Sequence, residues 1–259
     1  MKKILLNTLF LLLTINTSHS AEVEHHFKVN LGTFDAAEAK FSYSLSPHTY
    51  SVNSIISTSG LFHTLYPFQA KYSTSGKIKK DQLQTTDYHY SSQSRFNSRS
   101  KELIYNEDGI PIYQINTKNN KSKKRKIENS QHHKGTTDLQ TVFAALTKQY
   151  NELKFCDSRM EVFDGKRRFD VIFKDEGQEY ISACANGAFS GKASKCSMYI
   201  DKLNSDEDDL LWQLTSERPV YFWILEDTAT KKPFIAQIKV KDTPLGKLNV
   251  CTDKITIKE

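Results

Sequence analysis

The sequence predicts a mainly β protein: one antiparallel, strongly curved sheet or incomplete β-barrel or spiral, with one α-helix packed against it. Short stretches alternate apolar and polar residues between about 23 and 115, at the spacing of about 8–12 residues that is typical of a meander. Hydrophobic residues make up 38% of the 259 residues, fewer than in most soluble domains, which fits a sheet with one wet face. Only one segment has persuasive helical spacing. We expect residues 21–259 to form a single β-rich domain.

Residues 1–20 have the pattern of a cleaved secretory signal. Two lysines precede an apolar run at 4–15, and Ser18 and Ser20 are the small residues before Ala21. The run is shorter than the roughly 20 residues that span a bilayer, so we expect no anchor after cleavage. The pattern predicts export to the periplasm.

The first strands are expected where this alternation is clearest, at 26–31, 40–45 and 49–55. Residues 106–109 read Asn-Glu-Asp-Gly, and Asp-Gly accepts the positive φ of a tight hairpin turn. These features predict hairpins that join successive antiparallel strands.

A polar segment at 116–135 carries seven basic residues and one acidic residue. Nucleic acid is not an expected partner of an exported chain, so the candidate partners are lipid headgroups, lipopolysaccharide or an acidic envelope protein. Because like charges repel and bury little area, we expect a flexible insertion here. Its candidate residues for binding an anionic surface are Lys121, Lys123, Lys124, Arg125 and Lys126.

The predicted helix runs from about residue 138 to 152. Thr137 and Gln140 resemble a capping box, and apolar residues follow at helical spacing on one face. Strands are expected again beyond the helix, with turns at 164–166 and 175–177 and an exposed acidic connection at 206–209. These later strands are predicted at 160–163, 167–173, 179–184, 220–225, 234–240 and 247–257.

The common catalytic and phosphate-binding motifs are absent from the sequence, so no enzyme activity, cofactor or metal is expected. The pairs His25–His26 and His132–His133 are interpreted as solvated, with a weak metal site as the alternative. Glu161, Asp164 and Asp170 are interpreted as partners in ion pairs around a hairpin. The alternative is a hydrolase or lyase that acts on an envelope polymer through the carboxylates near 161–170.

An aromatic cluster occupies residues 61–68 and is followed by Tyr72. Large aromatic residues usually belong to a strand core. The functional alternative is a sheet mouth that grips an acyl chain or a hydrophobic peptide. Its candidate ligand-binding residues are Phe62, Tyr66, Phe68 and Tyr72.

Four cysteines lie beyond the signal, at 156, 184, 196 and 251. An even number in an oxidising compartment predicts two disulfides with three possible connectivities. Zinc is disfavoured because the sequence has no close Cys-x-x-Cys pair.

The chain resembles a family of exported proteobacterial envelope proteins known as domain of unknown function 3108. The resemblance covers nearly all of the chain after the signal. Its most specific segments are 60–61, 76–78, 137–140, 162–170, 191–196 and 245–248, together with Cys156 and Pro233.

The resemblance implies a periplasmic open barrel or spiral and a Cys156–Cys196 bridge at the family's positions. Cys184 and Cys251 would then form a second bridge, which is expected to be this protein's own addition. The family supplies no established activity. Export, the β meander, the aromatic cluster and the missing catalytic motifs lead to one hypothesis. The protein is expected to be a non-enzymatic envelope factor that binds an amphipathic ligand or partner in support of envelope integrity.

Overall fold

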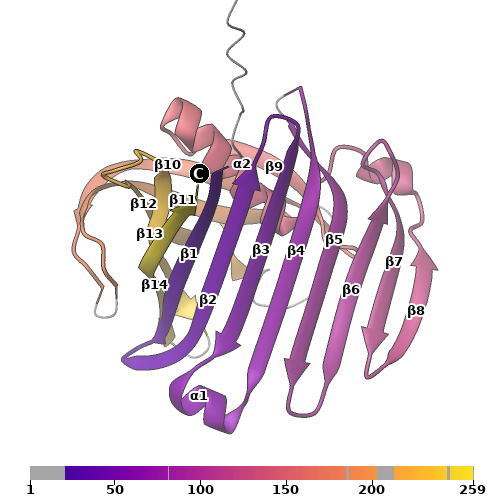
Figure 1. Cartoon of the computed structure of the whole chain (residues 1–259), viewed down its shortest axis with the longest axis horizontal. Coiled ribbons are helices and arrows are strands. Elements are labelled where there is room, and N and C mark those ends of the chain that lie inside the picture. The colour runs from indigo at the N-terminus through magenta and orange to yellow at the C-terminus, as the bar shows by residue number, and fades with distance from the viewer. Residues whose placement is uncertain (1–20, 81, 185–186, 203–212, 244–245, 259) are drawn as a thin grey trace, which may run out of the picture.

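The computed structural model describes residues 21–80, 82–184, 187–202, 213–243 and 246–258. It confirms a mainly β fold built on one antiparallel sheet of 14 strands (Figure 1). In the described part of the chain, β8 (Lys121–Lys126) and β9 (Ser158–Phe163) are the two ends of the strand order, so the sheet is not closed.

The strands follow the chain in two runs that meet where β1 pairs with β14. The first run forms one wall: β1 (Ala21–Leu31), β2 (Phe34–Leu45), β3 (Thr49–Thr58), β4 (Phe68–Lys79), β5 (Gln82–Ser94), β6 (Ser98–Tyr105), β7 (Pro111–Lys118) and β8. The second forms the facing wall: β9, β10 (Arg168–Ile181), β11 (Gly191–Lys202), β12 (Val220–Glu226), β13 (Pro233–Thr243) and β14 (Gly246–Lys258).

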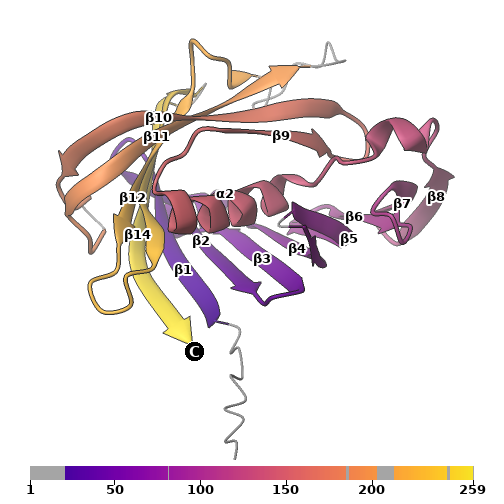
Figure 2. The ribbon, with the colours of Figure 1, turned by 90° about the horizontal axis from the view of Figure 1, so that it is seen from above.

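Helix α2 (Leu139–Leu153) lies between the two walls (Figure 2). One side of the helix places Val142, Leu146 and Tyr150 in a core with strands β9 to β12. Its other side places Ala144 against Tyr50 and neighbouring residues of the first wall. The helix therefore joins both walls, which requires apolar residues around more of its circumference than one stripe.

The predicted helix is confirmed, but its N-cap is Asp138 rather than Thr137. Asp138 is 1% exposed and accepts hydrogen bonds from the backbone N–H groups of Gln140 and Thr141. Its carboxylate also accepts from the Thr74 hydroxyl at 3.0 Å, the Thr85 hydroxyl at 2.9 Å and the Thr141 hydroxyl at 2.6 Å. One buried carboxylate thus caps the helix and ties it to β4 and β5.

The expectation of a flexible insertion at 116–135 differs from the structure. This segment contains the end of β7, all of β8 and the 3-10 helix η1 (Ser130–His133). Asn119 and Asn120 both have positive φ, as a two-residue hairpin turn requires. The side chains of β8 are all exposed, because an edge strand of this kind keeps its charges in water.

Two other local expectations were wrong. Residues 175–177 form a bulge within β10, where the register shifts between Asp175 and Gln178, so the strand continues past the expected turn. Residues 61–65 belong to the short helix α1 (Gly60–Leu65) and not to a strand. The predicted signal at 1–20 and the acidic connection at 206–209 lie outside the described residues.

Both expected disulfides are present. Cys156 is bonded to Cys196 inside the core of the second wall, and Cys184 is bonded to Cys251. Such bonds persist in oxidising compartments, which fits an exported protein. Among the described residues, no helix is long and apolar enough to cross a membrane.

Candidate ligand-binding cavity

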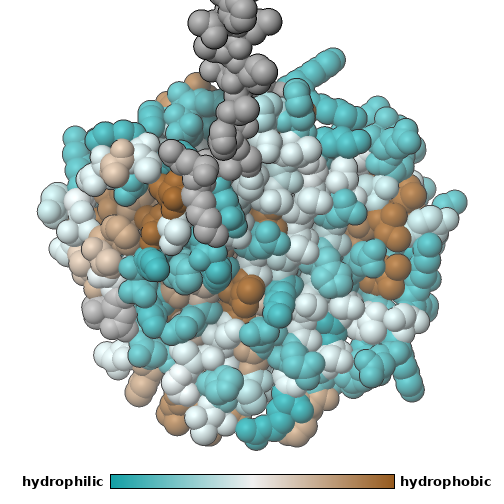
Figure 3. All heavy atoms as spheres, in the orientation of Figure 1, coloured by the Kyte–Doolittle hydropathy of each residue, from teal (hydrophilic) through white to brown (hydrophobic). Residues whose placement is uncertain are grey.

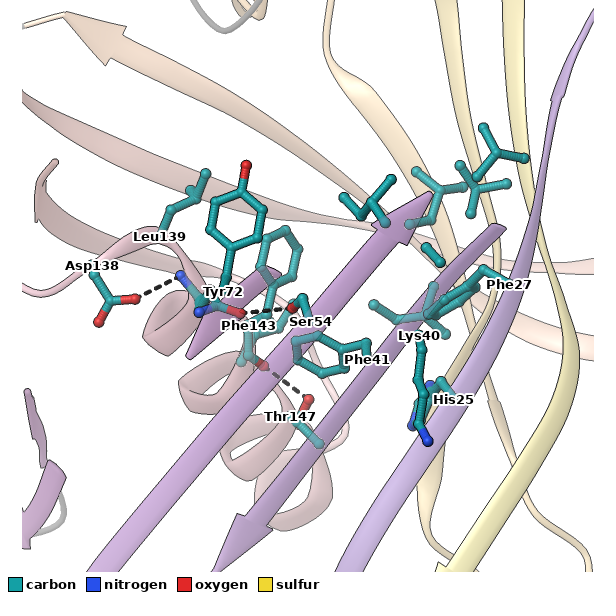
Figure 4. A pocket seen from close by; sticks show the side chains of 18 of the residues that line it. His25, Phe27, Lys40, Phe41, Ser54, Tyr72, Asp138, Leu139, Phe143 and Thr147 are labelled. Carbon is teal, nitrogen blue, oxygen red and sulfur yellow. Dashed lines mark hydrogen bonds between the residues drawn. The ribbon is translucent and has the colours of Figure 1, made fainter. Parts of the chain in front are cut away.

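A cavity of about 680 Å³ lies between α2 and the concave face of the sheet (Figure 4). Its walls come from both runs of strands and from the side of α2 that carries Leu139, Phe143 and Thr147. The volume lies within the range of about 300–1,000 Å³ that is typical of small-molecule sites. The cavity is partly open to solvent. Ile56, one of its wall residues, is 37% exposed.

Most of the cavity wall is apolar. Alternation along each strand sends every second side chain to the concave face, and the inward residues of five strands meet here. The apolar wall residues of the sheet include Phe27, Val29, Ala37, Ala39, Phe41, Ile56, Phe234, Ile235, Ile238, Leu248 and Val250. Ala37 and Ala39 are small, which leaves space above β2.

Charged and phenolic groups mark one part of the wall. Lys101 of β6 donates to the backbone carbonyl of Asp164 at 2.8 Å, and the Asp164 carboxylate pairs with Arg167 at 2.6 Å. Tyr90 is paired with Lys101 across β5 and β6, and Tyr72 of β4 is paired with Tyr90, with the two tyrosine ring centroids 4.8 Å apart. Burial lowers the pKa of Lys101, partly offset by Asp164, and burial raises the pKa of Tyr72 to about 12. This part of the wall therefore carries two basic groups, one carboxylate and neutral hydroxyl groups.

His25 differs from the expectation of two solvated histidines. It is 3% exposed, and neither ring nitrogen has a hydrogen-bond partner among the described residues. Its ring centroid lies 5.8 Å from that of Phe27, 6.0 Å from Tyr43 and 6.5 Å from Phe234. Burial, with a smaller effect of the charge on neighbouring His26, lowers the pKa of His25 to about 4.

Because the pKa of His25 is lower in the folded protein than in the unfolded chain, the free energy of unfolding should depend on pH. Between about pH 6.5 and pH 4 the unfolded chain takes up a proton at this side chain and the folded chain does not, so stability falls as the pH falls. The loss should approach about 3 kcal/mol at pH 4. His25→Phe keeps an aromatic ring and should remove this part of the pH dependence, measured by urea unfolding at pH 7 and pH 4.5.

The matched control for this experiment is His89→Phe, because His89 is exposed on β5. This control should lose as much stability between the two pH values as the unmodified protein. An equal loss in the His25→Phe variant would contradict the assignment.

Only one of the four aromatic residues that were predicted to bind a ligand lines the cavity. Tyr72 lines the cavity, but Phe62, Tyr66 and Phe68 are not among its wall residues. Phe62 lies on α1, and Tyr66 and Phe68 follow it with their rings stacked at 6.4 Å. Phe62 and Tyr66 lie in the segment between β3 and β4, and Phe68 is the first residue of β4, so all three stand at one end of this hairpin.

The three carboxylates near 161–170 all take part in ion pairs. Asp170 accepts from Arg159 at 2.8 Å, Glu161 pairs with Arg168 across the β9–β10 hairpin, and Asp164 pairs with Arg167. Asp164 lines the cavity, whereas Glu161 and Asp170 do not appear in its wall. The predicted basic residues at 121–126 lie on β8, at the outer edge of the first wall.

Sequence reasoning missed His25 and most of the apolar wall. A signal for His25 was present, since it shares the alternation of Val23 and Phe27 and therefore the inner face of β1. Alternation also marked the inner faces of β13 and β14. It did not show that these faces meet β2 and Phe143 of α2 around one cavity.

The fold and the cavity define an open, barrel-like β protein with a helix and an apolar interior space between its walls. The chain belongs to the family described as "Protein of unknown function (DUF3108)", whose model matches residues 26–246. A crystal structure of a beta-barrel-like protein of domain of unknown function DUF1849 from Brucella abortus is similar, with 9% identity and a TM-score of 0.50. That similarity covers 92% of this chain and 98% of the other, and it concerns the fold alone. A search of curated proteins found no match.

Proposed function

We propose that this protein is a non-enzymatic periplasmic envelope protein that binds an amphipathic molecule in the cavity under α2, in support of envelope integrity. The observation that carries the proposal is the cavity itself, with about 680 Å³ of space and a mainly apolar wall. A ligand with an acyl chain would replace water against that wall, which is favourable at about 25 cal/mol per Å² of buried apolar surface.

The polar part of the wall favours an anionic headgroup. Lys101 has three N–H donors, one of which is used on the Asp164 carbonyl. Arg167 is paired with the Asp164 carboxylate, so Lys101 and Arg167 together exceed that carboxylate by one positive charge. A carboxylate or phosphate here would form charge-assisted hydrogen bonds, which are stronger than neutral ones. The class of ligand best supported is therefore a fatty acid or another lipid with one acidic group.

We propose the periplasm as the compartment, because the two disulfides and the sequence pattern at 1–20 both indicate export. Cys156–Cys196 and Cys184–Cys251 require an oxidising environment to form and persist. The pattern at 1–20 is that of an export signal.

Binding can be tested with cis-parinaric acid, a fluorescent fatty acid. The unmodified protein should show saturable fluorescence enhancement, and Ala39→Trp should weaken it at least about tenfold because the indole fills the space above β2. Palmitic acid should displace bound cis-parinaric acid about tenfold more weakly from Lys101→Met, because one charge-assisted hydrogen bond to its carboxylate is lost. Displacement of cis-parinaric acid by hexadecanol, which has no carboxylate, should be unchanged.

Glu38→Trp is the matched control. Glu38 neighbours Ala39 on β2, is exposed and points to the opposite face. This variant should bind as the unmodified protein does. Absence of saturable binding to the unmodified protein, or equal weakening by both tryptophans, would refute the proposed function.

A further inference from the structure

Large exposed hydrophobic side chains gather at one end of the first wall. Of the nine such side chains among the described residues, six lie at the ends of β1 to β6 or on α1, and we call these six the apolar rim. The rim consists of Phe34, Ile56, Leu61, Leu65, Tyr66 and Phe96. Leu65 is 68% exposed and Phe96 is 75% exposed. Apolar atoms are visible at the lower edge of the molecule in Figure 3, where Figure 1 places α1.

Hydrogen bonds join the segments that carry the rim. The Ser59 N–H donates to the Ala36 carbonyl at 3.0 Å, which connects the start of α1 to β2. Arg95 donates to the Thr64 carbonyl at 3.2 Å, which connects the β5–β6 turn to α1. The Thr58 hydroxyl donates to the Tyr66 carbonyl at 3.1 Å. The rim is therefore one fixed surface and not a set of separate loop tips.

Basic side chains flank the rim at the same end of the sheet. Arg95 and Arg99 are exposed beside Phe96, and Lys118 and Lys121 are exposed at the adjoining β7–β8 turn. The Ser98 N–H donates to the Asn119 side chain at 2.9 Å, so these two turns are in contact. Apolar side chains bordered by cations are the composition that inserts into the interface of an anionic bilayer.

The rim is continuous with the cavity. Ile56 belongs to both, since it lines the cavity and is counted among the exposed hydrophobic residues. Val29 and Ala37 line the cavity within three residues of the strand ends at the β1–β2 turn, which carries Phe34. The rim and the cavity wall therefore meet at Ile56.

We propose that this end of the molecule docks reversibly on an anionic phospholipid bilayer, with the apolar rim among the headgroups and the cavity mouth toward the membrane. The docking goes beyond the proposed function and does not require it. Only its purpose, the transfer of a lipid to or from the cavity, rests on ligand binding there.

The test is co-sedimentation with phosphatidylcholine vesicles that contain phosphatidylglycerol. The unmodified protein should bind, and binding should weaken in vesicles of phosphatidylcholine alone and at high salt. The triple variant Leu61→Ser, Leu65→Ser, Phe96→Ser should bind at least about tenfold more weakly, because three apolar side chains no longer enter the interface. These side chains are 60–75% exposed, so the variant should keep the circular-dichroism spectrum and the unfolding midpoint of the parent.

The other exposed hydrophobic residues supply the matched control. Leu153→Ser, Phe155→Ser, Tyr180→Ser removes three exposed apolar side chains that lie on α2, after it and on β10, outside the rim. This control should bind vesicles as the unmodified protein does. Failure of the unmodified protein to bind anionic vesicles, or equal losses in the two triple variants, would overturn the docking proposal.

The two proposals fail separately. Soluble cis-parinaric acid without vesicles should bind the rim variant normally, and Ala39→Trp should still dock on vesicles. Vesicle binding without fatty-acid binding would sustain docking and refute the cavity ligand. Fatty-acid binding without vesicle binding would do the reverse.

Discussion

Asp138→Ala is expected to lower the free energy of unfolding by about 3–5 kcal/mol, through the loss of the N-cap and of partners for buried hydroxyl groups. The carboxylate accepts two backbone N–H groups at the start of α2 and three threonine hydroxyl groups. Urea unfolding monitored by far-UV circular dichroism measures the change.

Asp138→Asn should lose less than Asp138→Ala, because asparagine is also a good N-cap but is a weaker acceptor for the hydroxyl groups. The control is Asp108→Ala in the exposed β6–β7 turn, which should change stability by less than about 0.5 kcal/mol. Similar losses of unfolding free energy in Asp108→Ala and Asp138→Ala would show that the buried hydrogen bonds of Asp138 do not stabilise the helix.

The double variant Cys156→Ala, Cys196→Ala is expected to have a free energy of unfolding about 4 kcal/mol lower than that of the unmodified protein. The two residues are 40 positions apart, and the entropy of the unfolded chain rises accordingly when the link is lost. Both side chains are fully buried in the core of the second wall, so the smaller alanines also leave unfilled space. Urea unfolding under non-reducing conditions measures the loss.

Two comparisons make this result specific. Cys184→Ala with Cys251→Ala opens a longer loop, of separation 67, but Cys184 is only half-buried, so the packing loss should be smaller. Dithiothreitol should destabilise the unmodified protein and leave a variant without all four cysteines unchanged. A Cys156–Cys196 double variant within about 1 kcal/mol of the parent would contradict the expectation.

Local patterns predicted the strands and the helix well where one face is buried. Helix α2 and the strands β12, β13 and β14 were placed within a few residues, because alternation and helical spacing report on burial directly. Strand β11 (Gly191–Lys202) was not predicted, and β10 was predicted as two strands separated by a turn. The pattern failed at 61–65, where the exposed apolar residues of α1 imitate a strand core. It also failed at β8, where hydrogen bonds to β7 and a turn at Asn119–Asn120 form a strand without burial.

The cavity was harder to predict because its wall combines residues from both ends of the chain. Val29 of β1 is paired with Val250 of β14 at the join between the two runs of strands, and Phe143 of the helix lines the same cavity. No local pattern encodes that meeting. Tyr72 was predicted as a ligand-binding residue from its proximity to the aromatic cluster, and its place in the wall depends instead on the inward face of β4.

The open sheet leaves the outer edge of β8 with backbone groups to which another strand could add. Five of its six residues are lysine or arginine. A second molecule arriving edge to edge would bring a matching row of positive charge to within about 5 Å, the distance between paired strands. Electrostatic repulsion would then oppose chain-to-chain growth, so the unusual basicity of this segment has a protective consequence: it discourages polymerisation of a fold that never closes on itself.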